Sequence, residues 1–288
     1  MIANLAGLLF DGVAYGSLLF LVAVGLSITM GLMNVVNLAH GAFAMAGGYL
    51  AVTAMNRLGW PFWSTLPLAF LGSALLGMVA ERLVYRRLYR ASHLDQVLFT
   101  IGLVFASIAA ATWGFGAGQQ LVTLPPALSG QVRIVGVDLG VYRLFLVAVV
   151  AIATILLQAM VTRTRFGAQI RAAVDNRAAA AGLGIDVDLI FSLCFGLGTG
   201  LAGLGGALGV EVLGLDPNFP LKYMVYFLLV VVVGGAGSIT GPLAAALILG
   251  ICDVAGKYFV PELGAFVIYA LMIVLLVLFP KGLGARRA

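Results

Sequence analysis

The stretch Leu228-Leu229-Val230-Val231-Val232-Val233 decides the fold class, because its apolar residues follow one another without a polar break. A strand of a membrane β-barrel would alternate apolar and polar residues over about 10 positions. The whole chain is 62% hydrophobic and 9% charged, whereas a soluble domain carries about 25% charged residues. The sequence therefore predicts an all-α integral membrane protein that forms a single domain, residues 1–288.

Apolar runs broken by charge, glycine or proline mark the candidate membrane spans. A helix needs about 20 apolar residues to cross the hydrocarbon core of a bilayer. The first residues lack the basic region of a cleaved signal peptide, so the first run is expected to remain as a span. We expect a polytopic bundle of about 8–9 transmembrane helices near residues 5–30, 38–55, 62–80, 97–115, 143–161, 189–211, 221–235, 239–256 and 263–280.

The net charge of +5 is interpreted as a determinant of membrane topology and not as a nucleic-acid-binding surface. Cytoplasmic loops carry an excess of Lys and Arg, so three basic segments are expected in the cytoplasm. The N-terminus is outside if all nine spans cross, or inside if the first crossing is absorbed at the interface. The basic residues of the three segments are Arg82, Arg86, Arg87 and Arg90, then Arg163, Arg165, Arg171 and Arg177, then Lys281, Arg286 and Arg287.

Three other features of the sequence have structural interpretations. Segment 116–142 is rich in Gln, Pro and Gly and predicts an external loop with a small hairpin, which is either a partner surface or a passive connector. The glycine run 196–206 contains GxGxxG, but it lies within a span, where small residues four apart let helices approach closely. Cys194 and Cys252 lack disulfide or zinc-ligand spacing. No metal site and no catalytic residue is predicted.

Two interruptions of the apolar pattern correspond to each other near the two ends of the chain. Residues 31–41 form the first break and residues 234–242 the second, and a helix of small residues follows each. On the topology above both breaks lie on the same side, so the halves resemble a parallel internal repeat. Paired interruptions indicate a translocation pathway, although Asn, Ser and Gly also cap ordinary helices. The pathway candidates are Asn34, Asn37, His40, Gly41, Gly235, Gly237 and Ser238.

Ionisable residues are rare in the predicted spans. Asp253 and Lys257, spaced i,i+4, are expected to pair with each other. No chain of proton-relaying side chains follows from the sequence at mid-membrane. This disfavours an ion-coupled secondary carrier, although sodium sites can be built from backbone carbonyls.

Segment 162–188 is unusual for a loop, because its Ala-rich centre favours a helix. Ile170, Val174 and Ala178 recur four residues apart and predict one apolar stripe, while Gly182 and Gly184 predict its end. Such a helix suits docking into a groove on a soluble partner, or lying among lipid headgroups. The chain contains no GxxxxGK[ST] sequence and is therefore not a P-loop ATPase by itself.

The sequence resembles the permease subunits of the branched-chain amino acid ABC importers. The resemblance rests on four motifs that lie in order over almost the whole chain. Many family members have Glu directly after the His-Gly pair, whereas this chain has Ala42, so a role for that carboxylate does not transfer. The motifs are residues 25–41, Glu81-Arg82 with Tyr85-Arg86, the spaced residues Gly167, Arg171, Ala172, Asp175, Ala180, Gly184 and Ile185, and residues 234–241.

The resemblance implies a multi-pass subunit of the bacterial plasma (inner) membrane that works by alternating access. Its partners would be a second permease, two cytoplasmic ATPases and an external solute-binding protein, with lipid around it. The chain would bind no cofactor, since the ATPases use the ATP. The resemblance carries ATPase coupling onto Gly167, Arg171, Ala172, Asp175, Ala180 and Gly184.

The sequence does not determine which solute is transported. The resemblance implies branched-chain amino acids or related small polar solutes, with the binding protein setting much of the choice. An ion-coupled carrier of small organic solutes is the main alternative. A membrane enzyme is disfavoured because His40 and His93 are isolated, and a channel would move solute without ATP hydrolysis.

Overall fold

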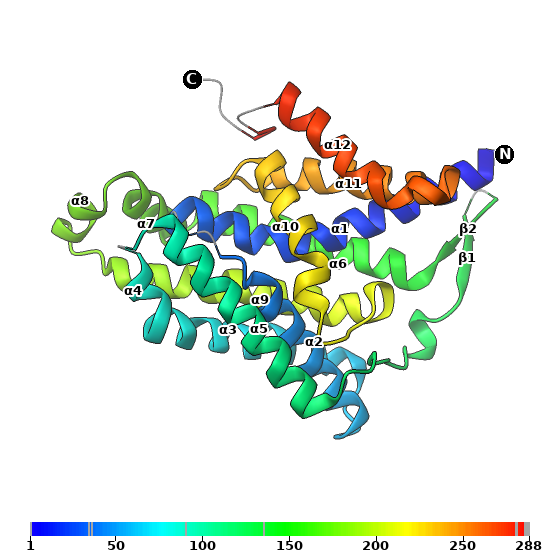
Figure 1. Ribbon diagram of the computed structural model, residues 1–288, viewed down its shortest axis with the longest axis horizontal. Coiled ribbons are helices and arrows are strands. Elements are labelled where there is room, and N and C mark those ends of the chain that lie inside the picture. Colours follow the sequence, from blue (N-terminus) through cyan, green and yellow to red (C-terminus); the bar gives the residue numbers. More distant parts are fainter. Residues whose placement is uncertain are drawn as a thin grey trace.

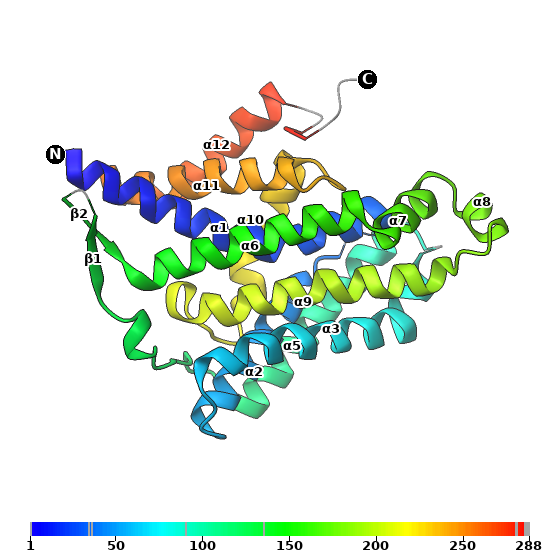
Figure 2. The same ribbon diagram turned by 180° about the vertical axis from the view of Figure 1, so that it is seen from behind.

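A computed structural model shows an elongated bundle of helices with a small hairpin at one end (Figures 1 and 2). The structure describes residues 2–33, 35, 37–89, 91–134, 136–279 and 282–284. Asn34, Arg90, Lys281, Arg286 and Arg287, which are named above, lie outside the described residues.

The chain folds into helices joined by short connections and one two-stranded sheet. Strands β1 (Gln131–Ile134) and β2 (Val137–Gly140) pair antiparallel, with Gln131 opposite Gly140. The helices are α1 (Ile2–Met33), α2 (His40–Asn56), α3 (Phe62–Ala80), the π-helical turn η1 (Glu81–Tyr85), α4 (Arg86–Leu88), α5 (His93–Phe115), η2 (Pro126–Leu128), α6 (Val141–Arg163), α7 (Arg165–Asp175), α8 (Arg177–Gly182), α9 (Val187–Leu213), α10 (Phe219–Gly234), α11 (Thr240–Phe259), η3 (Pro261–Leu263) and α12 (Gly264–Leu278).

Within these described ranges, a helix lies at each of the nine predicted spans. Six are long and apolar enough to cross a membrane: α1, α3 with its continuation to Leu88, α5, α6, α9 and α11. Helices α10 and α12 are apolar but shorter, and α2 has 17 residues. The all-α membrane fold is thus confirmed, while the count of eight or nine spans stays a prediction.

Helix α9 lies at the centre of the bundle because its glycines let three other helices approach it. A Cβ atom added at Gly25 of α1 or at Gly47 of α2 would collide with the α9 backbone at Gly198 or Gly203. Helix α3 packs against the same helix through Gly77, which faces Thr199. Small residues at such positions are typical of tightly packed membrane helices. The packing interpretation of the glycine run is therefore confirmed.

Helices α1 and α11 pack antiparallel along most of their length. Gly12 lies against Ile251, Gly16 against Ala246, and Gly31 against Gly237. This contact brings the second break beside the end of α1, so both breaks begin at the same end of the bundle. Helices α2 and α10 run steeply across the long axis (Figure 1). The parallel repeat stays a prediction.

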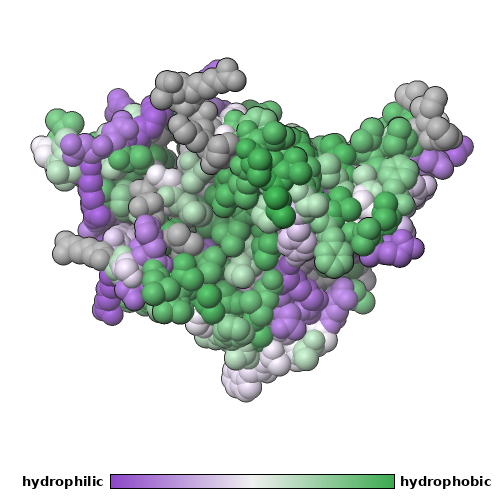
Figure 3. Space-filling model, turned by 45° about the horizontal axis from the view of Figure 1, so that its top comes forward, coloured by the Kyte–Doolittle hydropathy of each residue, from purple (hydrophilic) through white to green (hydrophobic). Residues whose placement is uncertain are grey.

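The two ends of the bundle differ in character. Helices α4, α7 and α8 lie at one end, whereas the hairpin, which confirms the one predicted in segment 116–142, lies at the other beside the start of α1 (Figure 2). Gly7 of α1 lies next to Val137 of β2. Figure 3 shows hydrophobic residues over the middle of one face and hydrophilic residues toward its two sides and in a patch below the middle.

Candidate functional site

The second break is held against α1 by backbone and hydroxyl hydrogen bonds. The Gly237 N–H donates to the Ser27 carbonyl oxygen at 2.9 Å, and the Ser27 hydroxyl donates to the Ser238 carbonyl oxygen at 2.9 Å. Gly235 and Gly237 have φ angles of 90° and 79°, which glycine adopts without steric cost. A Cβ atom at Gly31 would lie 2.6 Å from the Gly237 nitrogen. Glycine is therefore required on both sides of this contact.

Ser238 also starts the helix that follows the break. Its Oγ accepts a hydrogen bond from the Gly241 N–H at 3.2 Å, near the first turn of α11. The Gly284 N–H donates to the Gly234 carbonyl at 2.9 Å, so the chain after α12 returns to this break. Ser238 precedes the N-cap residue Ile239, and its hydroxyl accepts from an N–H group of the first turn.

The first break buries its polar side chains instead. Asn37 Oδ1 accepts hydrogen bonds from the Tyr85 hydroxyl at 2.9 Å and the Ala39 N–H at 3.0 Å. His40 Nε2 lies 3.0 Å from the Val22 carbonyl oxygen, to which it donates. Both side chains are buried, and Asn37 Nδ2 and His40 Nδ1 have no hydrogen-bond partner among the described residues.

Gly41 sits where α2 meets the start of α10. A Cβ atom there would lie 3.1 Å from the Cα of Pro220. Asn37, His40 and Gly41 line a crevice with residues of α1 and α10 that is too narrow to admit a water molecule. Asn37, His40 and Gly41 therefore line a closed crevice in this structure.

The basic segment after α6 forms two short helices, not one. The Thr164 hydroxyl oxygen accepts from the Gly167 N–H at 3.1 Å and starts α7. Asn176 interrupts the helix, and its Oδ1 accepts from the Ala179 N–H at 3.0 Å to start α8. Asn side chains favour such caps over helix interiors.

The interruption divides the predicted apolar stripe, because Ile170 and Val174 lie in α7 whereas Ala178 lies in α8. Ile170 is buried, but Val174 and Ala178 are exposed. The buried face of α7 consists of Gly167, Ile170 and Ala173 instead. A Cβ atom at Gly167 would lie 2.6 Å from the Met160 carbonyl oxygen, so glycine lets α7 fold back onto the end of α6.

The remaining coupling candidates of this segment have distinct positions. Ala172 is half-buried and Ala180 is buried. Gly184 has a φ angle of 82°, and the Ile185 N–H donates to the Ala180 carbonyl at 3.1 Å. This left-handed ending is a common helix C-cap and confirms the predicted end of the helical segment.

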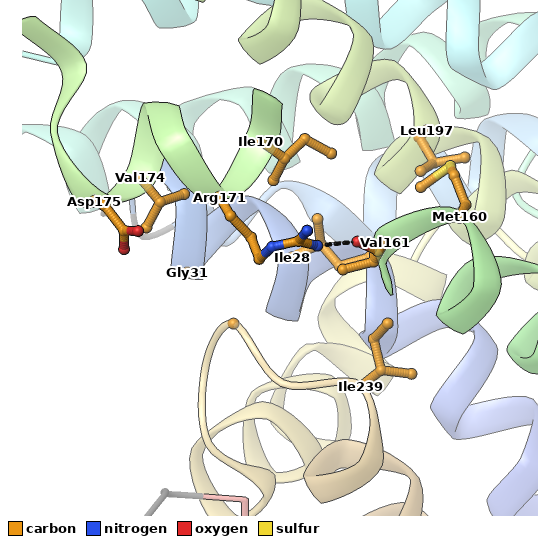
Figure 4. Close-up of a pocket in the computed structure, with 11 residues that line it drawn as sticks. Ile28, Gly31, Met160, Val161, Ile170, Arg171, Val174, Asp175, Leu197 and Ile239 are labelled. Atoms are coloured by element: carbon orange, nitrogen blue, oxygen red, sulfur yellow. Dashed lines mark hydrogen bonds between the residues drawn. The ribbon is translucent and has the colours of Figure 1, made fainter. Parts of the chain in front are cut away.

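A cavity of about 260 Å³ lies where this segment meets the second break. Arg171 reaches across it and donates to the Val161 carbonyl oxygen, while Asp175 lies one turn further along α7 (Figure 4). Gly31 and Gly237 line the same cavity. The structure thus brings coupling candidates Arg171 and Asp175 together with pathway candidate Gly237, and keeps Asn37, His40 and Gly41 apart from them.

A polar network that the sequence did not single out links the first break to α8. Glu81 is fully buried in η1, and its Oε1 accepts from the Tyr89 hydroxyl at 2.6 Å and lies 3.8 Å from Arg86 Nε. Asp188 at the start of α9 bridges Arg86 at 3.4 Å and Arg177 of α8 at 2.7 Å. Because Tyr85 of the same turn binds Asn37, the network joins the break to the basic segment. One signal in the sequence could have found it, namely an acidic residue at the end of an apolar run. The π-helical turn that holds Glu81, a feature frequent at functional sites, is seen only in the structure.

The fold and this junction define a multi-pass membrane protein with two helix breaks on one side and a surface segment that lines a cavity together with one of them. Residues 8–276 match the family described as the permease component of the branched-chain amino acid transport system. The chain belongs to this family of transport permeases. The expected resemblance and the expected place in the plasma membrane are confirmed.

Individual relatives agree with the family match. The chain is 28% identical to the high-affinity branched-chain amino acid transport system permease protein LivH of Escherichia coli K12, over 96% of this chain and 94% of that protein. It is 27% identical to BraD of Pseudomonas aeruginosa over 96% and 95%, and 26% identical to LivM of Salmonella typhimurium over 91% and 67%. No solved structure shows significant similarity to the chain.

Proposed function

We propose that the chain forms half of the pore of an ATP-driven importer for branched-chain amino acids or related small polar solutes. The observation that carries this proposal is the junction at which α7 packs against α6 and lines a cavity together with the second break, in a chain whose family is a permease family. A movement of α7 would change this cavity beside a helix break, where membrane proteins commonly place their transport pathways.

The assembly would contain this chain, a second permease, two cytoplasmic ATPases and an external solute-binding protein. Both LivH and LivM are named as permease proteins of one kind of transport system, which supports a pair of related but different permeases. The chain would bind no cofactor, because it lacks a P-loop sequence and the partner subunits would use the ATP.

The distribution of charge supports one orientation. Helices α4 and α7, which carry Arg86 and Arg171, lie at the same end of the bundle (Figure 1), and Gly284 contacts Gly234 of the second break. Cytoplasmic ends of membrane proteins are enriched in Lys and Arg, so this end would face the cytoplasm. The start of α1 and the hairpin would then be external.

The proposed mechanism is alternating access driven through two routes. ATP binding closes the ATPase pair and moves the docked α7–α8 segment. The first route runs from Arg171 through the cavity to Gly237 and Ser27, and the second runs from Arg177 through Asp188 and the Glu81 network to Asn37. Because both routes end at helix breaks, their displacement would open the closed crevice at His40 toward solute.

Reconstitution of the complete complex in proteoliposomes tests the proposal. We expect uptake of radiolabelled L-leucine that requires the binding protein and ATP hydrolysis and that is lost when this chain is omitted. Uptake driven by a sodium or proton gradient without ATP would establish the secondary-carrier alternative. Downhill flux without either energy source would indicate a channel.

A further inference from the structure

A second cavity, of about 160 Å³, lies at the hairpin end of the bundle, far from the junction of α7 with the second break. Helices α1, α6, α9 and α11 enclose it. Its lining combines two acidic and two basic side chains with one aromatic ring: Asp11, Asp253, Arg143, Lys257 and Tyr15. Such a balanced set of charges is unusual between helices that are otherwise apolar, since charges inside membrane segments are costly and mark functional sites.

The floor of the cavity holds a carboxylate with one free oxygen. Asp253 is 1% exposed, and its Oδ2 accepts a hydrogen bond from Lys257 Nζ at 2.6 Å. Its Oδ1 is buried without a hydrogen-bond partner among the described residues. A buried carboxylate oxygen without a donor is unfavourable, so this atom is suited to receive a donor from a bound molecule.

The rim of the cavity is accessible and carries the two cationic side chains and the carboxylate of Asp11. The side chains of Arg143 and Lys257 are 43% and 53% exposed. Arg143 pairs with Asp11, and Lys257 Nζ lies 5.7 Å from the centre of the Tyr15 ring. The guanidinium group of Arg143 keeps further N–H donors for an anion, because an arginine offers five.

We propose that this cavity binds the zwitterionic main chain of an amino acid on its way into the pore. The α-ammonium group would donate to Asp253 Oδ1, and the α-carboxylate would accept from Arg143 and Lys257. A lone cation would meet two positive groups, and a lone anion would meet two carboxylates, so a molecule with both charges matches the lining best. A cavity of this size holds on the order of ten water molecules, which suits a small amino acid with its side chain toward the opening.

This site rests on the proposed function and deepens it, because it names the chemical group that the pore recognises. On the proposed orientation the cavity faces the external side, where a binding protein would release its solute. The site would contact only the α-ammonium and α-carboxylate groups, so it would accept amino acids with different side chains.

Binding of radiolabelled L-leucine to the purified permease pair in nanodiscs tests the site without the binding protein. Unlabelled L-leucine should compete, whereas leucinamide, which lacks the carboxylate, and 4-methylpentanoate, which lacks the ammonium group, should compete at least ten-fold more weakly. Arg143→Gln and Asp253→Asn should each weaken binding about ten-fold or more, because each removes a charged hydrogen-bond partner. The matched control is Asp138→Asn, which removes an exposed carboxylate of the hairpin that pairs with Arg133 outside the cavity.

The outcomes separate this inference from the proposed function. Equal competition by both analogues in the wild-type protein overturns the site, even if Asp253→Asn fails to fold. Wild-type affinity in Arg143→Gln overturns it as well. ATP-driven leucine uptake together with either result would leave the proposed function standing, whereas selective zwitterion binding without any ATP-driven uptake would support the site and overturn the function.

Discussion

The two helix breaks look alike in sequence but are stabilised by different means. The first break buries Asn37 and His40, whose side chains bind Tyr85 and the backbone of α1. The second break contributes mainly backbone atoms, and its glycines lie directly on α1 at Ser27 and Gly31. Only the second shares a cavity with α7.

This difference indicates that the two breaks respond to movement of the neighbouring helices in different ways. At the second break, backbone contacts backbone with no flexible side chain between them, so a displacement of α1 moves the break by nearly the same amount. A buried polar network, by contrast, has a discrete set of hydrogen bonds that can be exchanged for another set. We therefore expect the second break to move together with α1 when the cavity beside α7 changes, and the first break to respond through the Glu81 network.

The largest expected effect comes from crowding the second break. Gly31→Ala places a methyl group against the Gly237 backbone and should destabilise the protein by about 2–3 kcal/mol, as overpacking does. Gly102→Ala in α5 is the matched control, because its Cβ would meet nothing within 4 Å. Thermal unfolding of both variants in detergent checks the prediction. Equal midpoints would show that the contact between the breaks is not tight.

A smaller loss is expected at the first break. Asn37→Ala leaves the Tyr85 hydroxyl and the Ala39 N–H buried without an acceptor, which should cost about 1–3 kcal/mol. In the control Asn56→Ala, the lost hydrogen bond to the Leu121 carbonyl is exposed, and little change is expected. The same unfolding assay measures both. If Asn56→Ala loses as much stability as Asn37→Ala, the buried hydrogen bonds at the first break do not stabilise the protein more than an exposed one does.

Removal of the cap at the second break should have a weaker effect. Ser238→Ala deletes the acceptor for the Gly241 N–H, and loss of such a cap costs about 1 kcal/mol. Ser64→Ala removes an exposed hydroxyl that only donates to the Pro61 carbonyl and serves as the control. Hydrogen exchange at the first turn of α11 should rise in Ser238→Ala alone. An unchanged rate would contradict the capping role.

The smallest stability change is expected for the exposed ion pair of α8. Arg177→Ala breaks the contact with Asp188 and should cost less than about 1 kcal/mol, like other surface pairs. Arg133→Ala, in the exposed pair of the hairpin, should cost a similar amount. Only Arg177→Ala should lower the solute-stimulated ATPase rate of the complex. Equal rates in the two variants would exclude Arg177 from the route to the first break.

The sequence predicts the fold well where one physical signal dominates. Apolar run length places the nine helices, and glycine spacing identifies α9 as a packing helix. The interrupted segment 165–182 was mispredicted because helix propensity favours continuation through Ala178, whereas Asn176 caps a new helix. The local cap formed by the Asn176 side chain outweighs the helix propensity of the alanines there.

The candidate site was only partly predictable for a related reason. The breaks were visible as clusters of Gly, Asn and Ser, but which residues meet across them depends on packing between helices 200 positions apart, as for Ser27 and Gly237. In the sequence, Glu81 and Tyr85 stand out only as members of a family motif. These two residues connect Asn37 to Arg177 only because Asp188 lies between Arg86 and Arg177 in space. No spacing in the sequence indicates this contact.

The coupling role of the α7 junction is tested most directly by comparing ATP hydrolysis with solute uptake in the reconstituted complex. Arg171→Ala removes the hydrogen bond to Val161, and Asp175→Ala removes the carboxylate beside the same cavity. We expect the variant carrying both changes to assemble with the ATPases and to hydrolyse ATP at the basal rate, but to lose most solute stimulation and at least ten-fold of its uptake. Wild-type stimulation and uptake in that variant would contradict this coupling role.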